Sequence, residues 1–211
     1  MIRIWHAAIA VLVAIALVGQ TVLTVDDHRS LLNLYSYFTI QSNILILVAS
    51  VLIVVRPRRQ SEWWGTLRLA GLVGISVTGI VYATVLAGTA EFVGRAWYYD
   101  KIFHYIVPAM AVLGFFLFTP RTRFAKTDFV FIVWPIFWLG YTLLRAGIGT
   151  PNYQLGKGKY SYVPYEFLDI QRHGAASVLI ASLVVTVLAL GLAWLYWKFS
   201  NRDERAVEAD A

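Results

Sequence analysis

Two polar residues, Thr39 and His104, stand near the starts of long apolar stretches of the sequence. A polar side chain is costly inside a membrane and usually has a function there. A threonine hydroxyl becomes a nucleophile when a base takes its proton, and histidine is the most common base near neutral pH. Together the two side chains could hydrolyse an ester. Each also has a structural alternative: Thr39 can bond its own helix backbone, and His104 can lie at the membrane interface.

Asp100 precedes His104 by four residues, which on a helix stacks the carboxylate over the imidazole. A carboxylate bonded to one ring nitrogen leaves the other nitrogen free as a base. Lys101 and Arg95 are alternative partners for Asp100. This chemistry requires no metal or cofactor, and the chain has no cysteine to ligate a metal. A haem or metal site built from His104 and His173 is an alternative.

A stripe of polar residues surrounds Thr39. Ser36, Thr39, Asn43 and Ser50 are offset by 3, 4 and 7 residues and would share one helical face. Because lipid offers these groups no partner, the face is expected to point into the protein. Asn43, one turn after Thr39, is a candidate donor to the oxyanion of the reaction; a bond between helices is the alternative.

Three further residues are candidates for contacts with a substrate. Arg145 lies at the outer end of the fifth apolar stretch and could meet a carboxylate, although an arginine at the end of a span also extends to the interface without such a role. Ser42 adjoins Asn43, and Asp169 precedes the last apolar stretch.

Six apolar stretches must position these side chains. They lie at about 5–24, 37–55, 67–88, 102–119, 128–147 and 174–197, since about 20 apolar residues cross a bilayer. The first could instead be a signal peptide, but it is long for one and no A-x-A site ends it. The sequence therefore predicts an all-α fold with a single six-helix transmembrane domain over 1–200 and a disordered cytoplasmic tail over 201–211.

Composition agrees with a membrane protein. Hydrophobic residues make up 59% of the chain and charged residues 14%, against roughly a quarter charged in a soluble domain. The net charge of +6 would suggest a nucleic-acid partner in a soluble protein. Here the basic residues lie in short connections between spans, so we predict no nucleic acid and interpret the charge as a topology signal.

Lys and Arg residues predict the orientation, because they are enriched on the cytoplasmic side. One side of the membrane would hold eleven of the 18, namely Arg3, Arg56, Arg58, Arg59, Arg68, Arg121, Arg123, Lys126, Lys198, Arg202 and Arg205. Both termini are therefore predicted to be cytoplasmic, in the cell membrane. Thr39 and His104 are the third residues of the second and fourth spans, which both run inward. Both would lie within about 5 Å of the outer edge of the hydrocarbon.

The remaining patterns concern packing and the outer surface. Small residues in the third span, including Gly71, Gly74 and Gly79, predict close approach of neighbouring helices. The longest connection, about 148–173, is predicted to lie outside. A connection of this length is often a lid or binding loop, and a solvated linker is the alternative.

The chain resembles the androgen-induced / FAR-17a family, which includes the androgen-dependent TFPI-regulating protein, and more closely its bacterial six-span members. The resemblance rests on six spans in about 210 residues and on three motifs: Tyr37–Asn43, His104–Pro108 and Tyr165–Asp169. Animal members are threonine hydrolases that cleave fatty acid esters of hydroxy fatty acids. The resemblance implies that Thr39 is the nucleophile and His104 the essential histidine.

The predicted function is a membrane-embedded threonine hydrolase that cleaves lipid esters near the outer interface, with a fatty acyl ester as substrate and membrane lipids as its surroundings. The alternative is a lipid-binding or transport protein in which the same polar pocket binds without reacting. Polar groups near one interface argue against transport, since transporters place their binding sites near the midplane.

Overall fold

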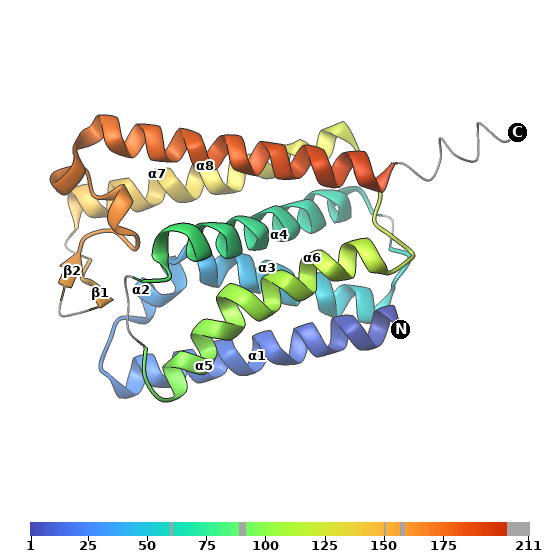
Figure 1. The fold of residues 1–211 in the computed structure, drawn as a ribbon, viewed down its shortest axis with the longest axis horizontal. Helices are drawn as coiled ribbons and strands as arrows, with labels where there is room; N and C mark the ends of the chain where they lie inside the picture. Colours follow the sequence, from blue (N-terminus) through green and yellow to red (C-terminus); the bar gives the residue numbers. More distant parts are fainter. Residues whose placement is uncertain (60, 89–91, 150, 157–158, 202–211) are drawn as a thin grey trace, which may run out of the picture.

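The computed structural model describes all residues except 60, 89–91, 150, 157–158 and 202–211. Six helical segments of 18 to 31 residues are long and apolar enough to cross a membrane, and they lie side by side in one bundle (Figure 1). The elements of these segments are α1 (Ile2–Asp26), α3 (Phe38–Val55), α4 (Glu62–Val81) with η1 (Tyr82–Leu86), α5 (Arg95–Lys101) with η2 (Ile102–Ile106) and α6 (Val107–Leu117), η3 (Lys126–Ile132) with α7 (Val133–Ile148), and α8 (Ile170–Ser200).

The prediction of an all-α membrane bundle with six spans is confirmed. The predicted tail falls almost entirely on residues 202–211, outside the described part of the chain. The N-terminus and the end of α8 lie at the same end of the bundle (Figure 1), here called the termini end. The opposite end is called the cap end. Three helical segments begin four or more residues earlier than predicted, at Glu62, Arg95 and Ile170.

The early start of α8 has a local cause. The Asp169 side chain accepts hydrogen bonds from the backbone N–H groups of Gln171 and Arg172, which caps the helix. At Gly174 the backbone is then interrupted by a φ of 77°, a value that glycine adopts without steric cost. The long apolar part of α8 therefore starts after Gly174, as predicted, and a separate capped turn precedes it.

The prediction that Ser36 shares a helix with Thr39 is wrong. Ser36 ends the short helix α2 (Leu31–Ser36), Tyr37 is extended with a ψ of 132°, and α3 begins at Phe38. The inward direction of the polar stripe is nevertheless confirmed, because its members are 0% to 6% exposed. The extended Tyr37 thus interrupts the helix between Ser36 and Thr39, but both side chains are still buried in the bundle.

Helix α4 is the central helix of the bundle and packs against α3, α6, α8 and η3. Its small residues make this possible. A Cβ atom added to Gly74 would lie 3.0 Å from Trp134, and one added to Gly79 would lie 3.0 Å from Pro108. The predicted close packing of this helix is confirmed, and a larger side chain at either position would push a neighbouring helix away.

Arg68 departs from its predicted position at the membrane surface. Helix α4 begins at Glu62, six residues earlier, and Arg68 is only 2% exposed. At 1.5 Å per residue it lies about 9 Å inside the helix end. Arg68 is therefore a buried residue of the bundle rather than an interfacial charge.

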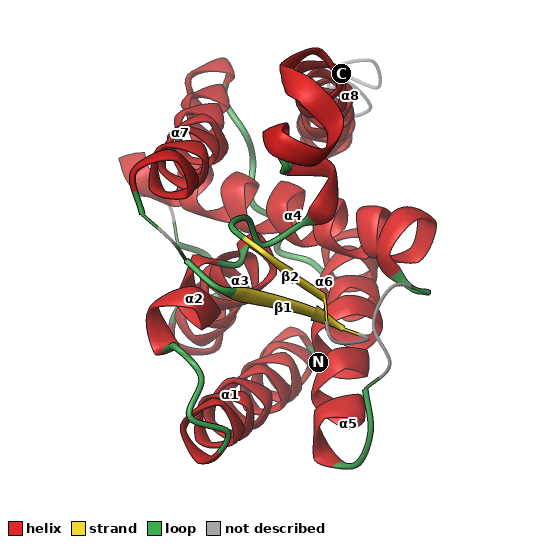
Figure 2. Cartoon of the chain, turned by 90° about the vertical axis from the view of Figure 1, so that its left-hand side faces the viewer, coloured by secondary structure: helices red, strands yellow, loops and turns green. Residues whose placement is uncertain are grey.

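The connection over 148–173 contains regular structure that the sequence did not predict. Strands β1 (Tyr153–Gly156) and β2 (Lys159–Ser161) form an antiparallel hairpin with Tyr153 opposite Ser161, and the turn η4 (Glu166–Leu168) follows. The hairpin lies across the cap end of the bundle (Figure 2). The connection is thus a folded cap and not an irregular linker.

Candidate active site

Thr39 occupies the second position of α3, with its side chain turned into the bundle and only 6% exposed. The extended backbone of Tyr37 separates α2 from α3 and starts a new helix at this depth. The first backbone N–H groups of a helix have no partner within the helix. Both the hydroxyl and the backbone N–H of Thr39 are therefore available to groups on other elements.

His104 brings its ring to Thr39 from the π-helical turn η2. Its Nε2 lies 3.3 Å from the Thr39 Oγ1 atom, within hydrogen-bonding distance. A π-helical turn inside a longer helix is often found at functional sites, because it re-aims one side chain. The two residues that the sequence singled out, 65 positions apart, thus meet in the folded chain.

Asp100 holds the other side of the imidazole. The His104 Nδ1 atom lies 2.9 Å from the Asp100 Oδ1 atom and 3.0 Å from the backbone oxygen of the same residue. The hydrogen bond is directed to the backbone oxygen, with the carboxylate beside it. Because both neighbours are acceptors, Nδ1 carries the proton and Nε2 is left to accept one from Thr39.

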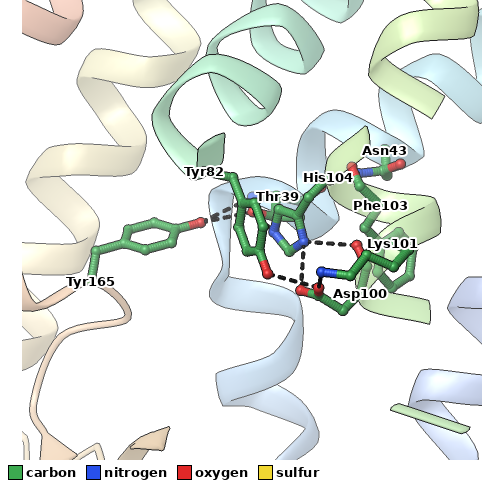
Figure 3. A network of polar contacts seen from close by, with 8 residues as sticks. All are labelled: Thr39, Asn43, Tyr82, Asp100, Lys101, Phe103, His104 and Tyr165. Carbon is green, nitrogen blue, oxygen red and sulfur yellow. Dashed lines mark hydrogen bonds and ion pairs between the residues drawn. The ribbon is translucent and has the colours of Figure 1, made fainter. Parts of the chain in front are cut away.

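The second carboxylate oxygen of Asp100 receives two donors. The Tyr82 hydroxyl donates over 2.7 Å and the Lys101 ammonium over 3.2 Å, while Asp100 itself is 4% exposed. Lys101, considered as an alternative partner, therefore shares the carboxylate with His104. The Tyr82 ring also stacks on His104, with 3.8 Å between ring centroids. The imidazole is fixed in position from its edge and its face (Figure 3).

Tyr165 of the cap approaches Thr39 from the opposite side (Figure 3). The backbone N–H of Thr39 donates to the Tyr165 hydroxyl oxygen over 3.1 Å, and the same oxygen lies 3.1 Å from the Thr39 Oγ1 atom. Burial raises the pKa of the Tyr165 phenol, which keeps the group protonated. Since Thr39 donates to His104, Tyr165 is left to donate to the Thr39 oxygen.

Asn43 is not placed to donate to an oxyanion. Its Nδ2 donates to the backbone oxygen of Thr39 over 2.8 Å and to that of Phe103 over 3.3 Å. These bonds tie the start of α3 to η2, which is the helix-joining alternative considered for this residue. Asn43 therefore holds α3 and η2 together, and both of its amide hydrogens are used in these bonds.

Ser42 lies behind Thr39 and is fully buried. Its hydroxyl donates to the Thr39 backbone oxygen over 3.1 Å and lies 2.8 Å from the Thr78 hydroxyl. Its hydrogen bonds thus join α3 to α4 instead of pointing to a substrate.

Arg145 and Asp169 are structural residues of the cap. The Arg145 guanidinium donates to Tyr153 over 2.7 Å, to Asn33 over 2.6 Å and to Ser36 over 3.2 Å. It fastens the hairpin and α2 to α7. Asp169 caps α8 and accepts a hydrogen bond from Ser161. Protein groups occupy the polar atoms of both residues, and a contact of either residue with a substrate stays a prediction.

A mostly apolar cavity of about 110 Å³ lies between α4, α7 and α8 and reaches Thr39 and Tyr165. Its wall includes Val77, Val185 and Ile136, and Ile136 is 59% exposed on the surface that would face lipid. The wall of the cavity therefore includes both Thr39 and a residue of the exposed surface. The cavity has room for a segment of an apolar chain, not for a whole lipid.

The arrangement does not favour the alternative of a haem or metal site built from His104 and His173. His173 lies in the first turn of α8 with its side chain exposed, whereas His104 is bonded to Thr39 and Asp100. Among the described residues, no three His, Asp or Glu side chains gather into a group that could hold a metal ion.

No protein-family model matches the chain, and neither a curated protein nor a solved structure matches it. The resemblance to the androgen-induced / FAR-17a family therefore stays a prediction. The fold and the site define a six-helix membrane bundle in which a buried threonine lies within hydrogen-bonding distance of a histidine, and the opposite nitrogen of that histidine lies beside a buried aspartate.

Proposed function

We propose that this protein is a membrane-embedded ester hydrolase in which Thr39 is the nucleophile and His104 the general base. The proposal rests on one observation: the Thr39 Oγ1 atom lies 3.3 Å from the His104 Nε2 atom, and the opposite ring nitrogen faces Asp100. Nucleophile, base and orienting group thus follow one another in the order used by catalytic triads.

In the first half of the reaction, the Thr39 oxygen attacks the ester carbon while its proton passes to the His104 Nε2 atom. The carbonyl oxygen gains the negative charge of the tetrahedral intermediate. When the intermediate collapses, the alcohol leaves with the proton from His104, and the acyl group stays on Thr39 as an ester.

In the second half, a water molecule gives its proton to the His104 Nε2 atom and attacks the acyl carbon. Collapse of this intermediate breaks the bond to the Thr39 oxygen, which takes the proton back. A carboxylic acid is released and the enzyme is regenerated. Asp100 keeps the proton on Nδ1 throughout and stabilises the imidazolium form.

The substrate class follows from the cavity. Its apolar lining suits a fatty acyl chain, and the exposed Ile136 at its wall allows a lipid ester to enter sideways from the membrane. The family resemblance adds fatty acid esters of hydroxy fatty acids as candidate substrates. The predicted orientation places this reaction near the outer interface of the cell membrane.

The proposal can be tested with purified protein in detergent or in vesicles, assayed for hydrolysis of fatty acyl esters. Thr39→Val, which removes the hydroxyl and keeps the shape, should lower the rate by ~10³-fold or more, as should His104→Ala. Thr39→Ser should keep part of the activity, because serine supplies the same hydroxyl.

Matched controls are Thr142→Ala and His173→Ala. Thr142 is buried, but its hydroxyl has no hydrogen-bond partner in the described structure, and His173 is exposed. Both variants should hydrolyse at the wild-type rate. A wild-type protein without activity, or activity that survives Thr39→Val, would show that the proposal is wrong. Saturable lipid binding that survives Thr39→Val in an inactive protein would favour the lipid-binding alternative.

A further inference from the structure

The reaction proposed above needs donors for the oxyanion, and the candidate from the sequence, Asn43, is already bonded to two backbone oxygens. Stabilisation of this charge is usually the largest single contribution to acyl transfer. The donors must therefore come from groups that the sequence did not suggest.

The start of α3 supplies one donor. The Tyr37 side chain makes no capping hydrogen bond to this helix, and the Thr39 N–H has no partner within it. The helix dipole also favours negative charge at this end. A backbone N–H on the nucleophile itself is a known oxyanion donor in serine proteases.

The Tyr165 hydroxyl marks the position that an oxyanion would take. Its oxygen lies 3.1 Å from the Thr39 N atom and 3.1 Å from the Thr39 Oγ1 atom. The carbonyl oxygen of an ester under attack by Oγ1 must lie beside the same two atoms. In the structure, the phenol oxygen thus occupies the place of the substrate oxygen.

The surroundings of Tyr165 hold its ring on this line. The ring stacks on Phe167 with centroids 5.7 Å apart, and lies edge-on to Tyr37 at 5.8 Å. Trp138 of α7 is 6.0 Å away on another side. These contacts direct the hydroxyl at the start of α3. For a substrate oxygen to take its place, the ring must withdraw by about one hydrogen-bond length, ~3 Å.

We infer that the Tyr165 hydroxyl and the Thr39 backbone N–H together form the oxyanion hole. In the resting protein the Thr39 N–H donates to the phenol oxygen, and the phenol donates to the Thr39 Oγ1 atom. When the ester carbonyl oxygen enters between them, both donate to it. The inference rests on the proposed hydrolase function and names its missing catalytic group.

The electron and proton balance requires no further reactant. As the Thr39 oxygen bonds to the ester carbon, its proton goes to His104 and the carbonyl electron pair becomes the oxyanion. Tyr165 keeps its proton and donates a hydrogen bond only. On collapse the carbonyl re-forms and the bond to the leaving oxygen breaks.

The test compares Tyr165→Phe with wild type in ester hydrolysis. Loss of one oxyanion donor should lower kcat by ~10²–10³-fold and leave KM nearly unchanged, since Tyr165 would act on the transition state. The matched control is Tyr162→Phe, which changes a 42% exposed tyrosine of the same connection and should keep the wild-type kcat.

A second measurement separates oxyanion binding from cap packing. A fatty acyl trifluoromethyl ketone forms a bond to the Thr39 oxygen and carries an oxyanion, whereas an ether of equal length cannot. Tyr165→Phe should weaken ketone binding by ~10²-fold or more and leave ether binding unchanged. Equal weakening of both ligands would assign Tyr165 to packing and overturn the inference.

The outcomes separate the inference from the proposed function. Activity that is lost in Thr39→Val but unchanged or raised in Tyr165→Phe would overturn the inference alone. A raised rate would mean that Tyr165 only blocks access to Thr39. Activity that survives Thr39→Val, or an inactive wild type, would overturn both.

Discussion

The bundle buries two polar clusters, one near each end, and they differ in their charges and their access. The cap-end cluster contains Thr39, His104, Asp100, Tyr82 and Tyr165. The termini-end cluster contains His6, Ser50, Arg68, Ser76 and Tyr196. In the first, His104 and Lys101 lie beside the carboxylate of Asp100, and Thr39 and Tyr165 line a cavity.

The termini-end cluster contains no carboxylate and has no access to the cavity. His6 bonds Ser50 over 3.1 Å and Tyr196 bonds Ser76 over 2.8 Å, and each of these residues is at most 5% exposed. The Arg68 Nη1 atom has no hydrogen-bond partner among the described residues. None of the cluster lines the cavity. Buried polar residues thus hold helices together at the termini end, while the proposed chemistry rests on the arrangement of those at the cap end.

The comparison of the two clusters predicts that substitution of Asp100 causes the largest loss of activity. Asp100→Asn should lower kcat by about 10²–10³-fold, because the amide can donate to Nδ1 and favour the wrong tautomer. The backbone oxygen of residue 100 still accepts from Nδ1, so we expect less than the ~10⁴-fold loss known for a serine protease. Steady-state ester hydrolysis by wild type and Asp100→Asn measures the change in kcat.

Asp27→Asn is the matched control for Asp100→Asn, since the Asp27 side chain is 57% exposed and pairs with Arg29 at the surface. It should keep the wild-type rate. An Asp100→Asn variant as active as this control would remove the orienting role of the carboxylate.

A smaller effect is expected from filling the cavity. Val185→Trp should lower the activity on long-chain esters by ~10-fold and leave acetyl esters nearly unaffected, because the added ring takes the space of the chain. The adjacent Val184 is 64% exposed and does not line the cavity, so Val184→Trp is the control. If both variants have the same chain-length profile, the acyl chain binds elsewhere.

The termini-end cluster should affect stability and not activity. Ser50→Ala leaves the buried His6 nitrogen without its partner and should lower the free energy of unfolding by about 1–3 kcal/mol. Thr84→Ala, at an exposed threonine that bonds its own helix, should cost less. Unfolding in detergent measures the loss of stability in Ser50→Ala. Ester hydrolysis by the folded variant should be unchanged. A large loss of kcat in Ser50→Ala would mean that the two clusters are coupled.

The features that the sequence could predict are those that depend on residues close together along the chain. The six spans follow from continuous apolar runs, and the Asp100–His104 contact follows from a spacing of four along one helical segment. Apolar runs and the spacing of four depend only on residues near one another in the chain, so the folded protein retains both.

The missed residues depend on tertiary contacts. Tyr165 reaches Thr39 across 126 positions from a folded connection, and Tyr82 reaches Asp100 from another helix. Neither contact has a periodic pattern. Arg145 and Asp169 were assigned to substrate because the sequence could not indicate which protein oxygens or N–H groups they face. Arg68 was misplaced because the helix starts outside the apolar run.

The central claim is that the Thr39 oxygen becomes covalently bonded during the reaction. The most direct test treats the protein with a fluorophosphonate and locates the adduct by peptide mass spectrometry, with Thr39→Val and Tyr162→Phe treated in parallel. We predict one adduct on Thr39 in wild type and in Tyr162→Phe, and none in Thr39→Val. An adduct on another residue, or hydrolysis and labelling that persist in Thr39→Val, would contradict the account.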